Sequence, residues 1–336
     1  MGDSIPVAEY VVGSFEDSKG VPWFGTMSHG VARYAPAPLA GVRTLTYIDT
    51  ALGLPPEGGH SIAEDANGLL WFAGHDGVYT YDPAVPDARV KQVFATAGRV
   101  GKDRGGHVWV STDRKLYQFK DGAQQELKSP VPPRATGEAP PPYTIGPGHI
   151  FFQLEDRQGR YWFSTDGYGA YRYDPMAPAD QAWTRLTKAD GLCSNTPWAI
   201  AEDREGRIWF ACVQAFQPTA TGDGGLCALD PSTPLRVGTF RSFPDVPGLH
   251  HNDLYTLLVD RDGALWSSAF KHGVYRYLNG SFTLFNTTDR PDLNGNFGLQ
   301  AMMQDSRGRY WMGFSGGLFT LQGDRLVHVP RGGPWE

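Results

Sequence analysis

The chain has 336 residues, of which 40% are hydrophobic, 20% charged and 13% aromatic, as expected for a soluble globular protein with a large core. Its 30 basic and 36 acidic residues give a net charge of −6, and no run of Lys and Arg stands out, so neither nucleic acid nor a membrane is favoured as a partner. No stretch is long and apolar enough for a spanning helix, and no basic segment precedes an apolar one at the start. We expect a monomer that is cytoplasmic, or secreted or periplasmic if a signal peptide has been removed.

One short pattern recurs seven times along the chain: an Asp, a Gly three residues later and a Trp six residues later. Asp at the first position of a β-turn accepts hydrogen bonds from the backbone ahead of it, and Gly at the fourth position tolerates positive φ. Each copy therefore predicts two strands joined by a tight turn, with the Asp as turn former and the Trp packed between neighbouring repeats. The copies are at residues 17–23, 65–71, 103–109, 156–162, 203–209, 260–266 and 305–311.

A third strand follows each copy, as in GVYTYDP (77–83), and most copies have a fourth, as in KQVFAT (91–96). Four strands in each of seven repeats predict an all-β fold, a seven-bladed β-propeller with four antiparallel strands per blade and one domain over residues 1–336. The last repeat has its own fourth strand in LVHVP (326–330), and IPVAEYVV (5–12) can supply the first strand of the first blade. The sequence alone leaves the closure of the ring open.

The segment DGLCSNTPWAIAEDREGRIWFAC (190–212) resembles the two-component-regulator propeller repeat, and the resemblance extends over nearly the whole chain. In the sensor proteins of that family such blades form an extracytoplasmic ligand-binding domain ahead of a membrane span and a kinase, neither of which we expect here. The architecture is also similar to that of the streptogramin lyases, which open a lactone ring by elimination with a divalent cation and a histidine. No motif here allows residues to be carried over from those enzymes.

Seven of the nine histidines fall in two classes of loop that share one face of the predicted propeller, around the mouth of the central channel. We call this the funnel face, and the opposite face, which carries the Asp-Gly turns, the turn face. Loops between second and third strands contain His29, His75 and His272, and the segments leading into first strands contain His60, His149, His250 and His251. The remaining two are expected elsewhere, with His107 in a turn of the turn face and His328 in the last outer strand.

We expect several of these histidines to bind a divalent metal ion, because neutral imidazole is a common ligand of transition metals. The predicted metal ligands are His60, His149, His251, His29, His272 and Asp253. The predicted catalytic residues are His60, His149, His251 and His75. Asp76 and Asp166 are further acids near the same loops. The alternative is that each histidine is an ordinary solvated loop residue.

Aromatic residues hold comparable lead-in positions in four blades and are predicted to contact an organic ligand: Tyr10, Trp198, Tyr255 and Phe297. Simple packing at the channel mouth is the alternative. Two insertions, at 129–148 and 213–225, also fall on the funnel face, where they could form a lid. Disordered loops without a role are the alternative reading of these insertions.

The three cysteines all belong to the fifth repeat. Cys212 and Cys227 flank the second insertion, so a disulfide between them could close it, and Cys193 precedes the first strand. An odd number of cysteines in a chain without an export signal favours reduced, packed thiols, with a catalytic thiol as a minor alternative.

Two functions remain open on the sequence. The first is a metal-assisted enzyme, a lyase, isomerase or hydrolase, acting on a small organic substrate in the central funnel through the histidine cluster. The second is a non-catalytic binding or sensor propeller that recognises a small molecule or glycan.

Overall fold

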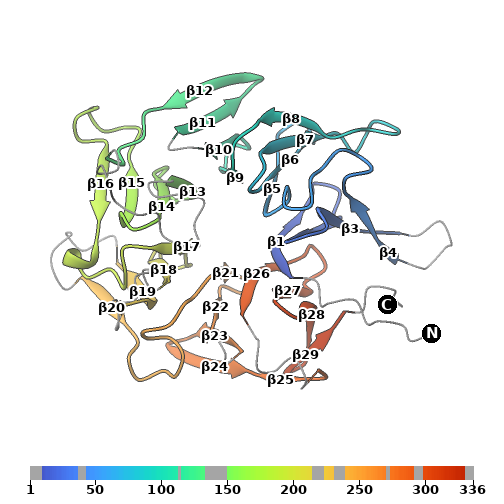
Figure 1. The fold of residues 1–336 in the computed structure, drawn as a ribbon. Coiled ribbons are helices and arrows are strands. Elements are labelled where there is room, and N and C mark those ends of the chain that lie inside the picture. Colours follow the sequence, from blue (N-terminus) through green and yellow to red (C-terminus); the bar gives the residue numbers. More distant parts are fainter. Residues whose placement is uncertain are drawn as a thin grey trace, which may run out of the picture.

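The computed structural model is a seven-bladed β-propeller, with seven antiparallel sheets arranged around a common centre (Figure 1). It describes residues 10–36, 43–112, 115–132, 150–213, 223–230, 239–269, 273–290 and 298–329. Helix is confined, within these residues, to the short 3-10 helix η1 (Lys188–Asp190), and no helix there is long and apolar enough to cross a membrane. The fold and the number of strands per blade are as predicted.

Each blade uses four consecutive strands, the first at the centre and the fourth at the rim (Figure 1). The first strands are β1 (Val11–Glu16), β5 (Ser61–Glu64), β9 (Gly98–Lys102), β13 (Ile150–Glu155), β17 (Pro197–Glu202), β21 (Leu257–Val259) and β26 (Leu299–Gln304). The second strands are β2 (Pro22–Thr26), β6 (Leu70–Ala73), β10 (Val108–Thr112), β14 (Tyr161–Thr165), β18 (Ile208–Cys212), β22 (Leu265–Ser268) and β27 (Tyr310–Phe314).

The third strands are β3 (Val31–Pro36), β7 (Val78–Tyr81), β11 (Lys115–Lys120), β15 (Ala170–Tyr173), β19 (Gly225–Leu229), β23 (Val274–Leu278) and β28 (Gly317–Gln322). The outer strands are β4 (Arg43–Ile48), β8 (Lys91–Phe94), β12 (Ala123–Leu127), β16 (Trp183–Leu186), β20 (Phe240–Ser242), β24 (Ser281–Phe285) and β29 (Arg325–His328). A short extra strand, β25 (Thr287–Thr288), pairs in parallel with β29.

The repeated Asp organises each turn on the turn face, and blade 4 shows how. Asp156 Oδ1 accepts hydrogen bonds from the backbone N–H groups of Gln158 and Arg160 at 3.0 and 2.9 Å, and Oδ2 accepts one from Trp162 Nε1 at 2.8 Å. The Trp-to-Asp bond occurs in all seven blades, with lengths from 2.6 to 3.4 Å. The Gly of each turn has φ between 73° and 84°, which other residues adopt only with strain. The Asp residues are therefore structural, as predicted.

The repeated Trp fills the space between one blade and the next. Trp162 is fully buried and belongs to the same hydrophobic cluster as Ile200 and Phe210 of the following blade. Large flat rings of this kind bury much apolar area at each junction, which stabilises the ring of blades. The predicted packing role is confirmed.

Among the described strands, none of blade 7 belongs to the sheet of blade 1, so the ring closes there without a shared sheet. Blade 7 has its own four strands, β26 to β29, and β1 is the innermost strand of blade 1. The two blades are joined on the turn face, where Ser306 donates from its backbone N–H and from Oγ to Glu16 Oε1, at 2.8 and 2.7 Å. The same two bonds join blades 1 and 2, from Ser18 to the Glu64 carboxylate.

Candidate functional site

A β-bulge interrupts the first strand of three blades, β1, β17 and β26, close to the funnel face. In β17, Pro197 pairs with Cys212 and Ala199 pairs with Ala211, so Trp198 is the extra residue of a β-bulge. A bulge turns a side chain out of the regular alternation, which here allows Trp198 to reach the neighbouring first strands.

In two blades, a large side chain occupies a position of the first strand where other blades have a small residue. Arg99 pairs with Ser111 and Phe151 pairs with Ser164. The equivalent residues in four other blades are Gly13, Ser61, Ala199 and Ala301. Blades 3 and 4 therefore place an arginine and a phenylalanine where their neighbours leave room.

These residues form one cluster across three successive blades. The Arg99 guanidinium carbon lies 4.8 Å from the centre of the Phe151 ring and 4.6 Å from that of the Trp198 ring, which is cation–π distance for both. Burial lowers the pKa of Arg99 to about 10, against the opposing effect of the Asp166 carboxylate. Arg99 is thus a cation at neutral pH, and the two rings hold its position.

A small, partly open pocket lies beside this cluster and combines apolar rings with polar groups. We call it the arginine pocket; it is lined chiefly by Arg99, Phe151, Trp198 and Asp166 and by the hydroxyl-bearing residues Ser164, Thr165 and Thr196. Asp166, in the loop between β14 and β15, is buried, whereas Arg99, Phe151 and Trp198 are partly exposed. The pocket therefore offers a fixed donor, an acceptor and aromatic surface to a ligand.

Aromatic residues continue from this pocket around the channel. The Trp198 and Tyr255 rings meet edge to face with centres 5.7 Å apart, and Tyr255 Oη donates to Asp253 Oδ2 at 3.4 Å. Burial first, and then the charges of Asp253 and Tyr10, raise the pKa of Tyr255. The structure thus brings together three of the four predicted ligand-contacting aromatics, and the fourth, Phe297, lies outside the described residues.

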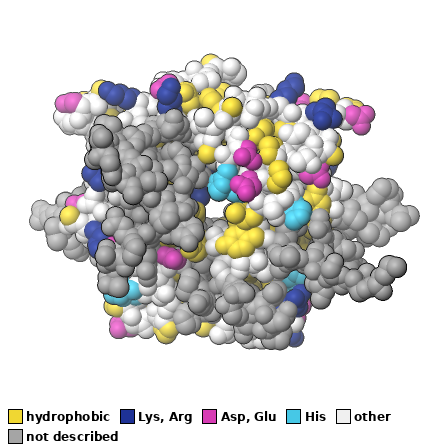
Figure 2. All heavy atoms as spheres, in the orientation of Figure 1, with side chains coloured by type: hydrophobic (Ala, Val, Ile, Leu, Met, Phe, Trp, Pro, Cys, Tyr) yellow, Lys and Arg dark blue, Asp and Glu magenta, His cyan; other side chains and the backbone are white. Residues whose placement is uncertain are grey.

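His60 and His75 also come together on the funnel face, with ring centres 4.7 Å apart. His75 Nδ1 lies 3.1 Å from a carboxylate oxygen of Glu57. Burial lowers the pKa of His60 to about 4, with smaller contributions from His75 and Arg99, so its imidazole is neutral at pH 7. The Nε2 atom of His60 is buried and has no hydrogen-bond partner among the described residues. Near the centre of the face in Figure 2, histidine, acidic and hydrophobic side chains lie beside one another.

The other described histidines lie where the repeat predicts but do not join this pair in a metal site. His251 stacks on His250 with ring centres 3.7 Å apart, and His250 forms a β-bridge with Gly225 of blade 5. His29 lines a separate pocket with Tyr47 and Asp49. Within the described part of the chain, no three His, Asp and Glu side chains form a group that could hold a metal ion. His149 and His272 lie outside that part, and the metal ion stays a prediction.

The remaining histidines are placed as predicted. His107 lies in the blade 3 turn, where its Nδ1 is 3.1 Å from Asp103 Oδ2, and His328 ends the outer strand β29. Most of the two predicted lid segments, residues 133–148 and 214–222, lies outside the described residues.

The expectation that all three cysteines are reduced is wrong, and the disulfide that forms is not the one considered between Cys212 and Cys227. Cys193 is bonded to Cys227, with Cα atoms 6.0 Å apart, and Cys212 is a buried free thiol. Cys212 pairs with Gly225, and Cys227 with Phe210, so the two strand cysteines are diagonal neighbours rather than direct partners. The lead-in segment instead places Cys193 over Cys227 at a separation that suits a disulfide.

The sequence prediction missed Arg99 and Phe151. Aligning the repeats on their Asp residues shows a signal for Arg99, which stands in a column that mostly holds Gly, Ala and Ser. Phe151 falls one residue earlier, in the same column as Trp198 and Tyr255. Their contacts with Trp198 join three different repeats, and no pattern within a single repeat contains that information.

Comparison with known proteins agrees with the architecture. Residues 191–214 match the family model described as "Two component regulator propeller". A search of curated proteins finds no significant match. The fold is similar to the extracellular domain of the hybrid two-component system BT3049 from B. thetaiotaomicron, with a TM-score of 0.68 and 19% identity over 96% of this chain and 40% of that one.

Two enzymes have the same fold. A streptogramin B lyase structure matches with a TM-score of 0.62 and 12% identity, over 94% of each chain. A GH74 xyloglucanase from Xanthomonas campestris matches with a TM-score of 0.69 and 15% identity, over 96% of this chain and 54% of that one. The chain spans less than half the length of the extracellular sensor domains it matches. At these identities the likeness shows the fold alone.

Proposed function

We propose that this propeller is a binding domain that captures a short oligosaccharide in the arginine pocket on the funnel face. The observation that carries the proposal is Arg99, held between the rings of Phe151 and Trp198 and beside the carboxylate of Asp166. The described first strands of four other blades have Gly, Ser or Ala at the position of this cation, so packing of the blades does not account for it.

The chemistry of the pocket suits a sugar. Each sugar ring has an apolar face, which packs on aromatic rings such as Trp198, and hydroxyl groups that both donate and accept hydrogen bonds. Arg99 can donate to them and Asp166 can accept from them. The partly exposed Tyr255 extends the aromatic surface toward blade 6, which gives a second sugar unit a place to bind.

The proposed function also bears on where in the cell the protein is located. The similar sensor domains are extracellular, and the Cys193–Cys227 disulfide suits an oxidising environment. We place this propeller outside the cytoplasm, which is the second of the two locations considered from the sequence.

A binding screen tests the proposal. Wild-type protein is heated with neutral and with uronic-acid oligosaccharides, and any that raise its melting temperature are then titrated by calorimetry. We expect R99M and W198A to weaken the binding of a hit at least tenfold, because each removes one side of the pocket. R104M is the matched control, since Arg104 is an arginine of the turn face, with its side chain 55% exposed and 3.3 Å from Glu202. The proposal fails if no sugar binds, or if R99M binds as well as R104M does.

A metal-assisted enzyme is the second candidate, and the buried, unpartnered Nε2 atom of His60 favours it. Among the described residues only His75 offers a second imidazole nearby, and catalytic zinc sites commonly use three protein ligands, so we derive no reaction step. Elemental analysis of purified wild type and H60A decides the matter. A stoichiometric transition metal that H60A lacks would support this candidate over the first.

A further inference from the structure

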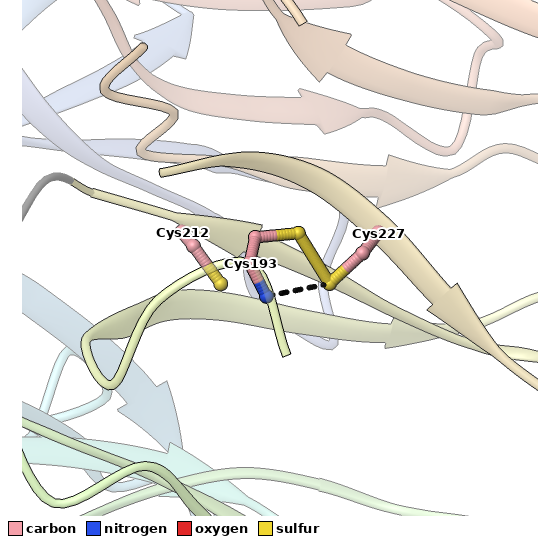
Figure 3. A group of neighbouring side chains, drawn as sticks. All are labelled: Cys193, Cys212 and Cys227. Carbon is pink, nitrogen blue, oxygen red and sulfur yellow. Dashed lines mark hydrogen bonds between the residues drawn. A yellow bond between two sulfur atoms is a disulfide. The ribbon is translucent and has the colours of Figure 1, made fainter. Parts of the chain in front are cut away.

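The three cysteines form a second cluster, separate from the arginine pocket. Cys193 comes from the segment that leads into β17, Cys212 ends β18, and Cys227 lies in β19 (Figure 3). Their three sulfur atoms all lie within 4.8 Å of one another. In the described part of the chain this is the one group of His, Cys, Asp and Glu side chains able to surround a metal ion.

We propose that, once the Cys193–Cys227 bond is reduced, these three cysteines form a binding site for one Cu(I) ion. Soft thiolates select Cu(I), Zn²⁺ or iron–sulfur clusters over harder cations. Structural zinc sites are nearly always four-coordinate, and no fourth His, Asp or Glu side chain of the described residues joins the three sulfurs. Cu(I) accepts three sulfur ligands in a plane, which matches the number available here.

The spacing is compatible with such a site. Three sulfurs about 2.3 Å from a central ion are about 4 Å from one another, and all three pairs here lie within 4.8 Å. Reduction separates the two bonded sulfurs, which brings the set nearer to that triangle. Small side-chain rotations are enough, because all three cysteines already point toward one another (Figure 3).

The three sulfurs lie in an apolar region of blade 5 that contains a few hydrogen-bond donors. The backbone N–H of Cys193 donates to Cys227 Sγ at 3.3 Å, and backbone N–H groups of Cys193 and Ser194 also hydrogen-bond to the Cys212 sulfur. Burial is the larger effect and raises the pKa of the Cys212 thiol to about 12, and these hydrogen bonds only partly offset it. Cys212 and Cys227 are fully buried in the hydrophobic cluster that contains Leu192, which keeps water and oxygen from the ion. Cys193 is partly exposed and provides the route of entry.

The site forms in two steps, reduction of the disulfide and then binding of the ion. A dithiol reductant supplies two electrons and two protons to the disulfide and becomes a disulfide itself, which leaves three thiols. Cu(I) then binds and displaces the thiol protons, with no change in its oxidation state. The disulfide form retains only the Cys212 thiol, so copper binding and the disulfide exclude one another.

A Cu(I) titration tests the inference. Reduced protein, freed of reductant under anaerobic conditions, competes for Cu(I) with the chelator bicinchoninate. We expect one Cu(I) per chain, X-ray absorption that shows three sulfur neighbours, and at least tenfold weaker binding by C212A. C212A keeps the disulfide cysteines, so its fold can be verified by circular dichroism before reduction.

Wild-type protein with the disulfide intact is a control that needs no variant, and it should take up no Cu(I) at the same chelator concentration. Equal uptake by the reduced and disulfide forms, equal uptake by C212A, or stoichiometric Zn²⁺ binding in preference to Cu(I) would overturn the inference. The outcome is independent of oligosaccharide binding, which involves neither Cys212 nor Cys227.

Discussion

The two faces of the propeller use their side chains in opposite ways. On the turn face, the same Asp accepts the same Trp Nε1 hydrogen bond in seven blades. On the funnel face, each blade contributes something different, from His60 in blade 2 and Arg99 in blade 3 to Trp198 in blade 5. Groups that every blade needs stabilise the fold, whereas groups that one blade has are available for recognition. Substitutions on the two faces should therefore change different measured quantities.

The largest effect on stability is expected on the turn face, from D156A. The substitution removes the acceptor of two backbone N–H groups, of Trp162 Nε1 and of Arg160 Nε, which donates to it at 2.7 Å. Leaving such buried donors unpaired should lower the free energy of unfolding by about 3 kcal/mol. Urea unfolding measures this change.

D65A is the matched control for D156A. Asp65 is partly exposed, its bond to Trp71 Nε1 is 3.4 Å long, and no arginine of its own turn pairs with it. We expect a loss of about 1 kcal/mol there. If D65A and D156A cost the same, the buried hydrogen bonds are not what makes the turn stable.

On the funnel face, His60 should make stability depend on pH. Its pKa falls from 6.5 to about 4 on folding, chiefly because of burial, so the unfolded chain binds a proton between these pH values and the folded one does not. Stability should therefore decrease as the pH falls from 6.5 to about 4. Melting temperatures across this range should fall less steeply for H60Q than for wild type; parallel curves would contradict the assignment.

Asp305 on the turn face should make stability depend on pH in a more acidic range than His60 does. Burial alone would raise its pKa, but hydrogen bonds from Trp311 and Arg309 outweigh burial and lower it below 3.8. This carboxylate thus stabilises the fold above pH 3.8, and its contribution is lost as the pH falls through the lower folded pKa. D305N should flatten the acid end of the melting curve and leave the part above pH 4.5 parallel to wild type, a difference that H60Q does not produce.

The same contrast explains what the sequence could predict. The contacts of the turn are local, because the Asp accepts its hydrogen bond from a Trp only six residues later. The repeat therefore predicts the blades, their number and the packing of the Trp residues. The loops that carry the histidines followed from the repeat as well. The repeat did not predict which side chains of different blades come into contact, because Arg99 and Trp198 belong to blades 3 and 5, which are not adjacent. The Cys193–Cys227 disulfide was not predicted for a related reason, since the position of Cys193 depends on how its lead-in segment folds over the sheet.

The smallest effect on stability is expected where the ring closes. On the turn face, a Ser and a Glu form the same pair of hydrogen bonds between blades 7 and 1 as between blades 1 and 2. Glu16 accepts two hydrogen bonds from Ser306 of blade 7, and Glu64 accepts the same two from Ser18 of blade 1. E16A and E64A should each cost about 1 kcal/mol. They should differ in where the protein opens, since the chain runs directly from blade 1 to blade 2 but not from blade 7 to blade 1, which the bonds from Ser306 to Glu16 join.

Hydrogen exchange should therefore rise in β1 and β26 for E16A and stay close to wild type in those strands for E64A. E16Q is the control for charge, because its amide oxygen still accepts from Ser306. Equal exchange in β1 and β26 for E16A and E64A would mean that closure is no weaker than the other junctions, and that packing of the inner strands alone holds the ring together.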